Sequence, residues 1–133
     1  MLKLEIVTPE KRVLDTEVDS VTVTTATGEA GILPNHAPLI SALKPGILTY
    51  TIKGASDKLA VSGGFVEVNG NTVSVLADTA SSADEIDVAE ARSDKEAAEK
   101  AFAAVASGSI EDTESARDQI EAANVRIQLA SGK

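Results

Sequence analysis

The first part of the chain, up to about Leu76, alternates apolar and polar residues with a period of two. Val73 and Val75, for example, flank Ser74. Such alternation, rich in β-branched residues, is typical of strands with one buried and one solvated face. The same pattern occurs at Val21–Thr24, Leu48–Ile52 and Val66–Val68.

Turn signals separate these alternating runs at short intervals. They are Thr27–Gly28, Lys53–Gly54, Ser62–Gly64 and Asn69–Asn71. Asn69-Gly70-Asn71 is a strong hairpin signal, because asparagine and glycine tolerate the positive φ angles of tight turns. Many short strands joined by regular turns predict a β-sandwich or a β-barrel.

From about Ser82 onward the composition shifts to Ala, Glu, Asp, Lys and Arg, which favour helices. Two apolar stripes at spacings of three and four residues predict two helices. The first stripe comprises Val88, Ala91, Ala98, Phe102 and Val105 and is interrupted at Lys95, and the second comprises Thr113, Ala116, Ile120, Ala123, Ile127 and Ala130. Helices joined by so short a connection are expected to form an antiparallel hairpin.

The ends of these helices carry recognisable signals. Asp87 followed by Glu90 resembles a capping pair, Gly108 is expected to end the first helix, and Ser109 can cap the second. We therefore predict an α+β chain, with a β-sandwich over residues 1–83 and a helical hairpin over residues 84–133. Because the stripes are rich in alanine, which buries little area, the hairpin is either packed stably on the sandwich or marginal and movable.

Composition and charge exclude several classes of function. Aromatic residues are only 2% of the chain, so binding by base or sugar stacking is disfavoured. The net charge of −9 argues against nucleic acid and anionic lipid as partners. There is no cysteine, no apolar stretch of membrane-spanning length and no signal-peptide pattern at the start, so we expect a reduced, cytoplasmic setting without membrane insertion.

Catalytic motifs are scarce. His36 is the single histidine, and neither a zinc-ligand spacing nor a nucleophile-elbow sequence accompanies it. No phosphate-binding glycine loop is present. The residues favour a non-enzymatic protein that contacts other proteins. A stand-alone β-sandwich ligand-binding or adaptor module with a helical tail stays open as an alternative, and a small hydrolase that uses His36 comes third.

Two segments carry a family resemblance. Gly28-Glu29-Ala30-Gly31-Ile32-Leu33-Pro34-Asn35-His36-Ala37-Pro38-Leu39 resembles the signature of the epsilon subunit of F-type ATP synthases, and Ser62–Val68 resembles its second signature. The segments Val7–Glu10, Val75–Ala80 and Glu85–Asp87 agree in order and spacing. The resemblance covers essentially the whole chain.

The resemblance implies about ten short antiparallel strands in a β-sandwich, followed by the two helices. It implies a non-catalytic rotor subunit at the foot of the central stalk, which links the gamma subunit to the loops of the c-ring and couples proton or sodium flow to ATP synthesis. Gly28, Glu29, Gly31 and His36 are the contact residues that it suggests. The expected location is the cytoplasmic face of a bacterial inner membrane, with the thylakoid stromal face as the alternative.

In the family the helices either fold against the sandwich or extend towards the alpha/beta catalytic head and restrain ATP hydrolysis. Some members bind ATP as a regulatory ligand, through a motif that would place Ile86, Asp87 and Arg126 at the site here. Glu90 occupies the position of the motif arginine and would repel phosphate. We therefore expect weak or absent ATP binding and no required cofactor.

Overall fold

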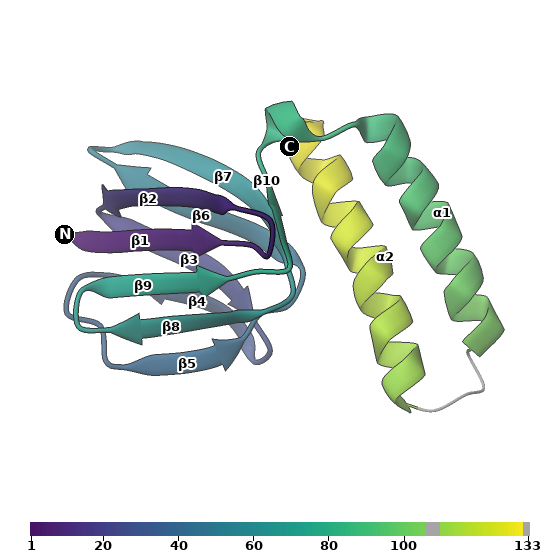
Figure 1. Cartoon of the computed structure of the whole chain (residues 1–133), viewed down its shortest axis with the longest axis horizontal. Helices are drawn as coiled ribbons and strands as arrows, with labels where there is room; N and C mark the ends of the chain where they lie inside the picture. Colours follow the sequence, from purple (N-terminus) through teal and green to yellow (C-terminus); the bar gives the residue numbers. More distant parts are fainter. Residues whose placement is uncertain (106–109, 132–133) are drawn as a thin grey trace.

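The computed structural model describes residues 1–105 and 110–131, and places ten strands in two sheets ahead of two helices (Figure 1). The strands are β1 (Leu2–Val7), β2 (Arg12–Val18), β3 (Ser20–Thr25), β4 (Gly28–Ile32), β5 (Leu39–Ala42), β6 (Gly46–Ile52), β7 (Ala55–Ser62), β8 (Phe65–Asn69), β9 (Thr72–Leu76) and β10 (Thr79–Ser81). A 3-10 turn, η1 (Ala83–Glu85), leads to α1 (Val88–Val105) and α2 (Ile110–Ala130). The predicted β-sandwich with a C-terminal helical hairpin is confirmed.

Each sheet has five strands. Sheet A has the order β2-β1-β9-β8-β5, and sheet B has the order β10-β7-β6-β3-β4. The strand pairs are antiparallel, as predicted, except for β1 and β9, which run parallel with Lys3 opposite Thr72. The first strand therefore lies in the interior of sheet A, between β2 and β9, which comes much later in the sequence.

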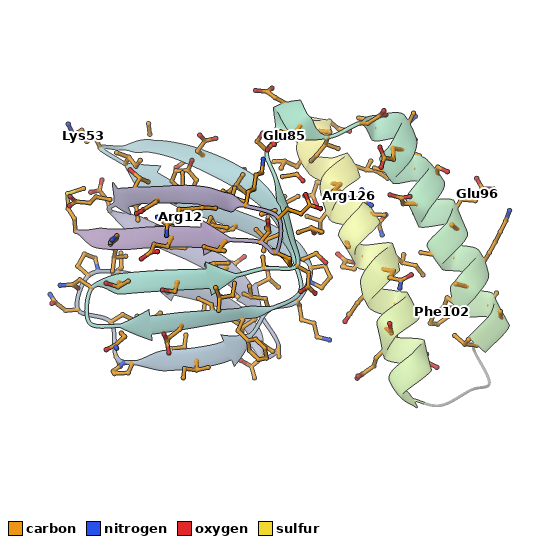
Figure 2. The ribbon with its side chains drawn as sticks, in the orientation of Figure 1. Arg12, Lys53, Glu85, Glu96, Phe102 and Arg126 are labelled. Atoms are coloured by element: carbon orange, nitrogen blue, oxygen red, sulfur yellow. The ribbon has the colours of Figure 1, made fainter. Side chains whose placement is uncertain are left out.

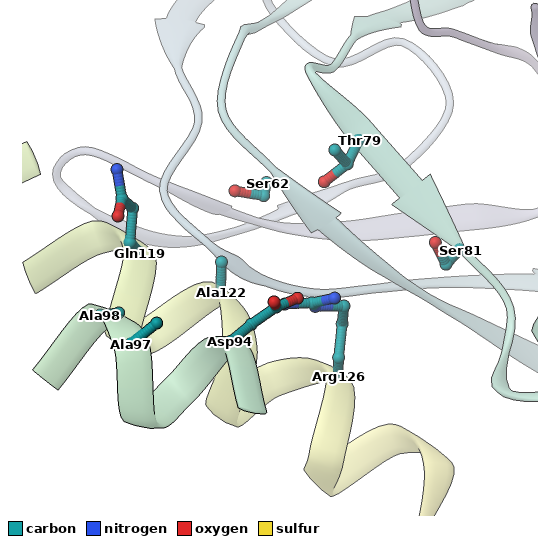
Figure 3. Close-up of a pocket in the computed structure, with 9 residues that line it drawn as sticks. All are labelled: Ser62, Thr79, Ser81, Asp94, Ala97, Ala98, Gln119, Ala122 and Arg126. Atoms are coloured by element: carbon teal, nitrogen blue, oxygen red, sulfur yellow. The ribbon is translucent and has the colours of Figure 1, made fainter. Parts of the chain in front are cut away.

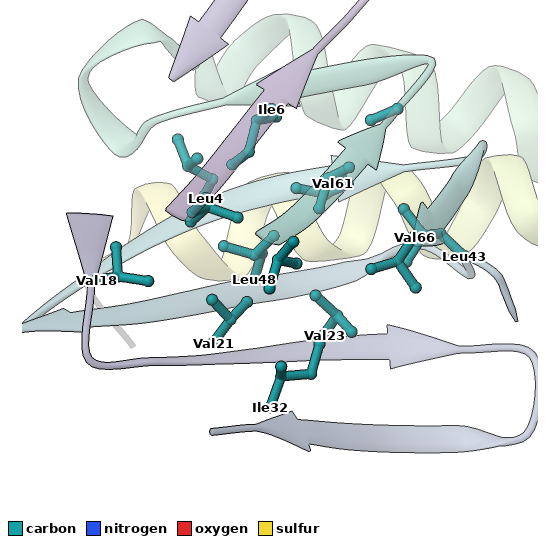
Figure 4. Packing of buried hydrophobic residues seen from close by; sticks show 14 of the residues in the cluster. Leu4, Ile6, Val18, Val21, Val23, Ile32, Leu43, Leu48, Val61 and Val66 are labelled. Carbon is teal, nitrogen blue, oxygen red and sulfur yellow. The ribbon is translucent and has the colours of Figure 1, made fainter. Parts of the chain in front are cut away.

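The core fills the space between the two sheets (Figure 4). Val21 and Val23 face inward from β3, while Thr22 between them faces outward. The same alternation holds on β1, β8 and β9. The fully buried side chains are Leu2, Leu4, Ile6, Val18, Val21, Val23, Ile32, Leu48, Val66, Val68, Val73 and Val75. Aliphatic residues thus build the sandwich without an aromatic centre.

Glycine is required at the turn between β7 and β8. Gly64 has a φ of +84°, a value that L residues rarely adopt, and a Cβ there would overlap the carbonyl oxygen of Leu76. Gly54, in the turn between β6 and β7, has a similar φ of +82° but open space around it. The turn before β8 is therefore sterically closed, whereas the turn at Gly54 is not.

The two helices pack on one another along the predicted stripes. Ala91 and Ala98 of α1 and Ala116 and Ala123 of α2 are buried. The backbone N–H of Glu90 donates to Oδ1 of Asp87 at 3.1 Å, so Asp87 caps α1 as predicted. The predicted stop at Gly108 and cap at Ser109 lie outside the described residues.

The hairpin lies against one end of the sandwich, with α2 next to the strands and α1 beyond it (Figure 1). Val125 and Leu129 of α2 form a small buried cluster with Ala60 of β7. Ile47 and Ile86 are partly buried against this cluster, which we call the helix seam. The hairpin is therefore docked on sheet B, but through far fewer apolar residues than join the two sheets.

Polar groups join the same two regions. Nζ of Lys44 lies 3.4 Å from Oδ2 of Asp118 on α2. At the junction, the N–H and hydroxyl of Ser82 donate to Oε1 of Glu85 at 3.0 and 3.1 Å, and Lys11 lies 3.5 Å from its other oxygen (Figure 2). The Ser82 backbone hydrogen bond is the main reason why the pKa of Glu85 is lowered.

Candidate functional site

The sandwich has two ends, which we name after the turns before and after β8, the Gly64 end and the Gly70 end. At the Gly64 end, Thr25 and Leu43 form an isolated antiparallel β-bridge. The N–H of Leu43 donates to the carbonyl oxygen of Gly64 at 2.9 Å. The helix seam is near this end, and Lys53 is at the opposite one (Figure 2).

Glu29 lies on β4, an exposed edge strand of sheet B. It is paired with Thr24, so its side chain belongs to the outer face. Gly31 is exposed on the same strand, and Gly28 begins it with a φ of +126° and open space around it. The structure thus brings Gly28, Glu29 and Gly31 together on one accessible edge, with the turn before them at the Gly64 end.

His36 is not part of that edge. Its Nδ1 lies 2.7 Å from the carbonyl oxygen of Ala37, and the N–H of its neighbour Asn35 donates to Oδ1 of Asn71 at 2.8 Å. Asn71 belongs to the turn between β8 and β9, so this loop lies at the Gly70 end. The structure therefore places His36 in a hydrogen-bonded loop at the opposite end from the Gly28 turn.

The outer face of sheet A carries an apolar patch that was not predicted. Phe65 and Leu76 are directly opposite one another on β8 and β9 and are 56% and 57% exposed. Ala42 pairs with Phe65 on one side, and Val7 pairs with Leu76 on the other. With Ile40, which is 72% exposed, these residues form what we call the outer-face patch: Val7, Ile40, Ala42, Phe65 and Leu76.

Large apolar residues at solvated positions of a sheet are informative, because the outer face of such a sheet is usually polar. A signal for them existed in the sequence. Phe65 has the same parity as Glu67 along β8, and Leu76 has the same parity as Ser74 along β9. Strict alternation therefore already assigned both side chains to the polar face.

A groove of about 510 Å³ lies between the two helices and the sheet (Figure 3). Its lining residues are Ser62, Thr79, Ser81, Asp94, Ala97, Ala98, Gln119, Ala122 and Arg126. Asp94 of α1 and Arg126 of α2 point toward one another within it, with a guanidinium nitrogen 3.0 Å from Oδ2. The cationic side chain of the groove is thus already neutralised by a carboxylate.

The three residues of the suggested nucleotide motif have separate roles here. Ile86 packs against the helix seam, the Asp87 carboxylate caps α1, and Arg126 pairs with Asp94. Arg117, another cation of α2, lies with its guanidinium carbon 5.9 Å from the centre of the Phe102 ring. These side chains are thus already engaged in contacts with the helical hairpin.

Within residues 1–105 and 110–131, no cluster of three or more His, Asp or Glu side chains is arranged to hold a metal ion. Within the same ranges, no helix has the length and hydropathy needed to span a bilayer.

The β-sandwich and the helical hairpin together define a known class. Residues 1–83 match the family model described as "ATP synthase, Delta/Epsilon chain, beta-sandwich domain". The chain belongs to the ATP synthase epsilon chain family, whose members are non-catalytic subunits of the synthase complex.

Individual relatives agree with this assignment. The ATP synthase epsilon chain of Herpetosiphon aurantiacus is 46% identical over 129 residues, covering 97% of this chain and 93% of the relative. That of Carboxydothermus hydrogenoformans is 54% identical over 91 residues, covering 68% of each. A solved structure of the Euglena gracilis mitochondrial ATP synthase, comprising OSCP, F1 and the c-ring, contains a chain that is 26% identical with a TM-score of 0.76, over 98% of this chain and 81% of that one.

Proposed function

We propose that this chain is the rotor subunit that links the gamma subunit of an ATP synthase to the loops of the c-ring, and so couples ion flow to ATP synthesis. The observation that carries the proposal is the outer-face patch. Its exposed side chains are mounted on a sheet whose other face is the rigid core. A close-packed sandwich resists deformation, and transmission of torque requires such stiffness.

The patch suits a permanent protein partner. Phe65, Leu76 and Ile40 expose apolar area that burial would stabilise at about 25 cal/mol per Å². We assign this face to the gamma subunit. The exposed edge with Glu29 is assigned to the c-ring loops, where a carboxylate sets register with polar or basic loop groups. Both surfaces reach the Gly64 end of the sandwich, and the subunit would sit on the cytoplasmic face of the membrane.

The helical hairpin is proposed to restrain ATP hydrolysis when it leaves the sandwich and contacts the alpha/beta head. The small helix seam supports this idea. The sandwich and the hairpin are packed separately, so little free energy is needed to part them at the seam. The Asp94–Arg126 pair joins α1 to α2 and is internal to the hairpin. The hairpin can therefore separate as one unit, without breaking the sandwich core.

Tight ATP binding is not part of the proposal. The groove presents Arg126 already paired with Asp94, and Glu90 adds a further negative charge at the start of α1. Calorimetry of the chain with ATP should give at most weak binding. Glu90→Arg is expected to raise the affinity only if the rest of the groove fits a nucleotide, so an unchanged titration would show that more of the site is missing.

The experiment that tests the function is a titration of the matching catalytic complex, lacking this subunit, with the full chain and with residues 1–83. Both should bind the gamma subunit, because the main core cluster ends at Ala77. Slower hydrolysis with the full chain alone would identify the hairpin as the restraint. Binding without inhibition would leave a structural coupler, and no binding by either would favour the adaptor alternative.

A further inference from the structure

The outer face of sheet A is organised in rows that cross the strands. One row contains the apolar pair Leu76 and Phe65, with Val7 and Ala42 on either side. In the next row Glu67 lies between Ser74 and Ile40. Neighbours in a row have Cβ atoms about 5 Å apart, and Phe65 is two residues from Glu67 on the same strand face. Glu67 thus borders the outer-face patch at Ile40 and Phe65.

Two other acids of this face have cationic partners. Lys3 lies 3.8 Å from Glu5, and Arg12 lies 3.2 Å from Asp15. Like Glu17 on the edge strand β2, Glu67 has no ion pair among residues 1–105 and 110–131. Its carboxylate is exposed and bordered by Ile40 and Phe65.

We propose that the partner seated on the outer-face patch presents a lysine or arginine to Glu67, from a segment whose apolar side chains cover Phe65, Leu76 and Ile40. The inference rests on the proposed function, because it specifies the chemistry of the gamma-facing surface. A partner that covered Glu67 without offering a cation would leave the carboxylate desolvated and unpaired, which costs free energy. The acid therefore selects for a basic group in the partner.

The negative charge of Glu67 disfavours three other occupants of the patch: a second copy of the chain, its own second helix and an anionic membrane surface. Two copies joined by a two-fold axis through this patch would bring Glu67 close to a second Glu67. The second helix is also acidic, with Glu114, Asp118 and Glu121. An anionic lipid surface would be repelled in the same way. A basic, partly apolar protein segment is the occupant that satisfies both the charge and the exposed apolar area.

The test is binding of three full-length variants to the matching synthase complex that retains gamma but lacks this subunit. Glu67→Lys is the test variant and Phe65→Ser tests the patch itself. Glu17→Lys is the matched control, because Glu17 is an exposed acid on the same outer face at the edge strand β2. Circular dichroism should be unchanged for all three, since each side chain points away from the core.

We expect Glu67→Lys to raise the Kd by about 30-fold or more, because it sets two cations against one another in a closed interface. The control should change the Kd by less than about twofold, as is usual for an exposed charge. A fourth variant, Glu67→Gln, removes the charge without reversing it, and its defect should be smaller than that of Glu67→Lys.

Each other outcome overturns a defined part of the proposal. Equal effects of Glu67→Lys and Glu17→Lys, with weakened binding by Phe65→Ser, would keep the docking face and reject the basic partner group. Unchanged binding by all variants would reject this face as the gamma-binding surface as well. Sedimentation that shows a dimer dissociated by Phe65→Ser would make a second copy the occupant and overturn the inference.

Discussion

The β-sandwich and the helical hairpin differ in how their parts are held together. The two sheets share one continuous core of Leu, Ile and Val, whereas α2 meets sheet B through a seam centred on Ala60, Val125 and Leu129. Because buried apolar area provides most of the stabilising free energy, the two boundaries must differ widely in strength. The boundary between the two sheets is the stronger one, as the proposed coupling role requires, and the helix seam is the weaker one, as the proposed release of the hairpin requires.

The outer surfaces differ in the same sense. The sandwich exposes apolar side chains such as Phe65 on a rigid sheet, while α1 carries mostly charged and small residues toward solvent. A rigid apolar face suits a permanent contact, and a polar helix suits reversible exposure to water. The comparison therefore supports the proposed division, with coupling in the sandwich and regulation in the helical hairpin.

The largest effect is expected at the closed turn of the sandwich. Gly64→Ala should destabilise the chain by about 3 kcal/mol or more, since the new Cβ must displace the Leu76 carbonyl in addition to the positive-φ strain. Gly54→Ala, with nearly the same φ and open space, should cost only about 1–2 kcal/mol. Urea denaturation of both variants measures the difference. Equal losses would show that the turn has room to relax.

The helix seam should respond more weakly and only locally. Leu129→Ala is expected to weaken docking of the hairpin by about 2 kcal/mol, because Leu129 is buried against a small cluster. The control Leu76→Ala makes the same change at a 57% exposed position and should have little effect on stability. Hydrogen exchange should show faster exchange in α2 and unchanged protection of β1 and β9.

A different pattern in that experiment would break the comparison. If Leu129→Ala lowers the protection of the sandwich strands as much as Leu48→Ala in the core does, the two regions unfold as one cooperative unit. The hairpin would then be a structural part of the domain, and its separation from the sandwich would require global unfolding.

A smaller effect is expected from the ion pair between the two regions. Lys44 and Asp118 are both partly exposed, with side-chain exposures of 40% and 44%, so their coupling should be about 0.5 kcal/mol. A double-mutant cycle with Lys44→Ala and Asp118→Ala, read by exchange in α2, measures it. The coupling should fall in high salt. A coupling that is zero at low salt would leave the apolar seam as the whole attachment.

The smallest effect concerns acid at the junction. The pKa of Glu85 is lowered from its usual 4.5, chiefly by the Ser82 backbone hydrogen bond, so its stabilising contribution is present above about pH 4.5. That contribution is lost as the pH falls through the lower folded-state pKa. Glu85→Gln should therefore differ from the wild type near neutral pH and converge with it in acid. A gap in Tm that is constant from about pH 7 to about pH 3 would contradict this.

Much of the fold could be predicted because its signals are local. Alternation at Val73 and Val75 assigns inner and outer faces, and Asn69–Asn71 places a hairpin turn. The parallel pairing of β1 with β9 could not be predicted, because it depends on which distant strands meet. The seam residues Val125 and Leu129 were also missed, since they form a second, shorter face of a helix whose main stripe faces α1.

The candidate site was predictable only in part. The resemblance indicated Gly28, Glu29, Gly31 and His36, and the structure gathers the first three on one edge while it holds His36 at the other end. His36 is close to the Gly28 turn in the sequence. Only the path of the chain along β4 shows that the two lie at opposite ends of the sandwich. The outer-face patch was missed because it combines the hairpin of β8 and β9 with β1 and β5, which are far from that hairpin in sequence.

The position of β1 inside sheet A has a consequence for how the protein is made. The second neighbour of β1 is β9, where Thr72 lies opposite Lys3. Because Thr72 lies almost at the end of the sandwich sequence, this pairing cannot form until most of the sandwich has been synthesised. Contacts between such distant residues slow folding, because a long loop must close before they form. On the ribosome the first strand therefore emerges early and remains half-paired until nearly the whole sandwich has been synthesised. The helices, which follow last, dock on a sheet that is already complete.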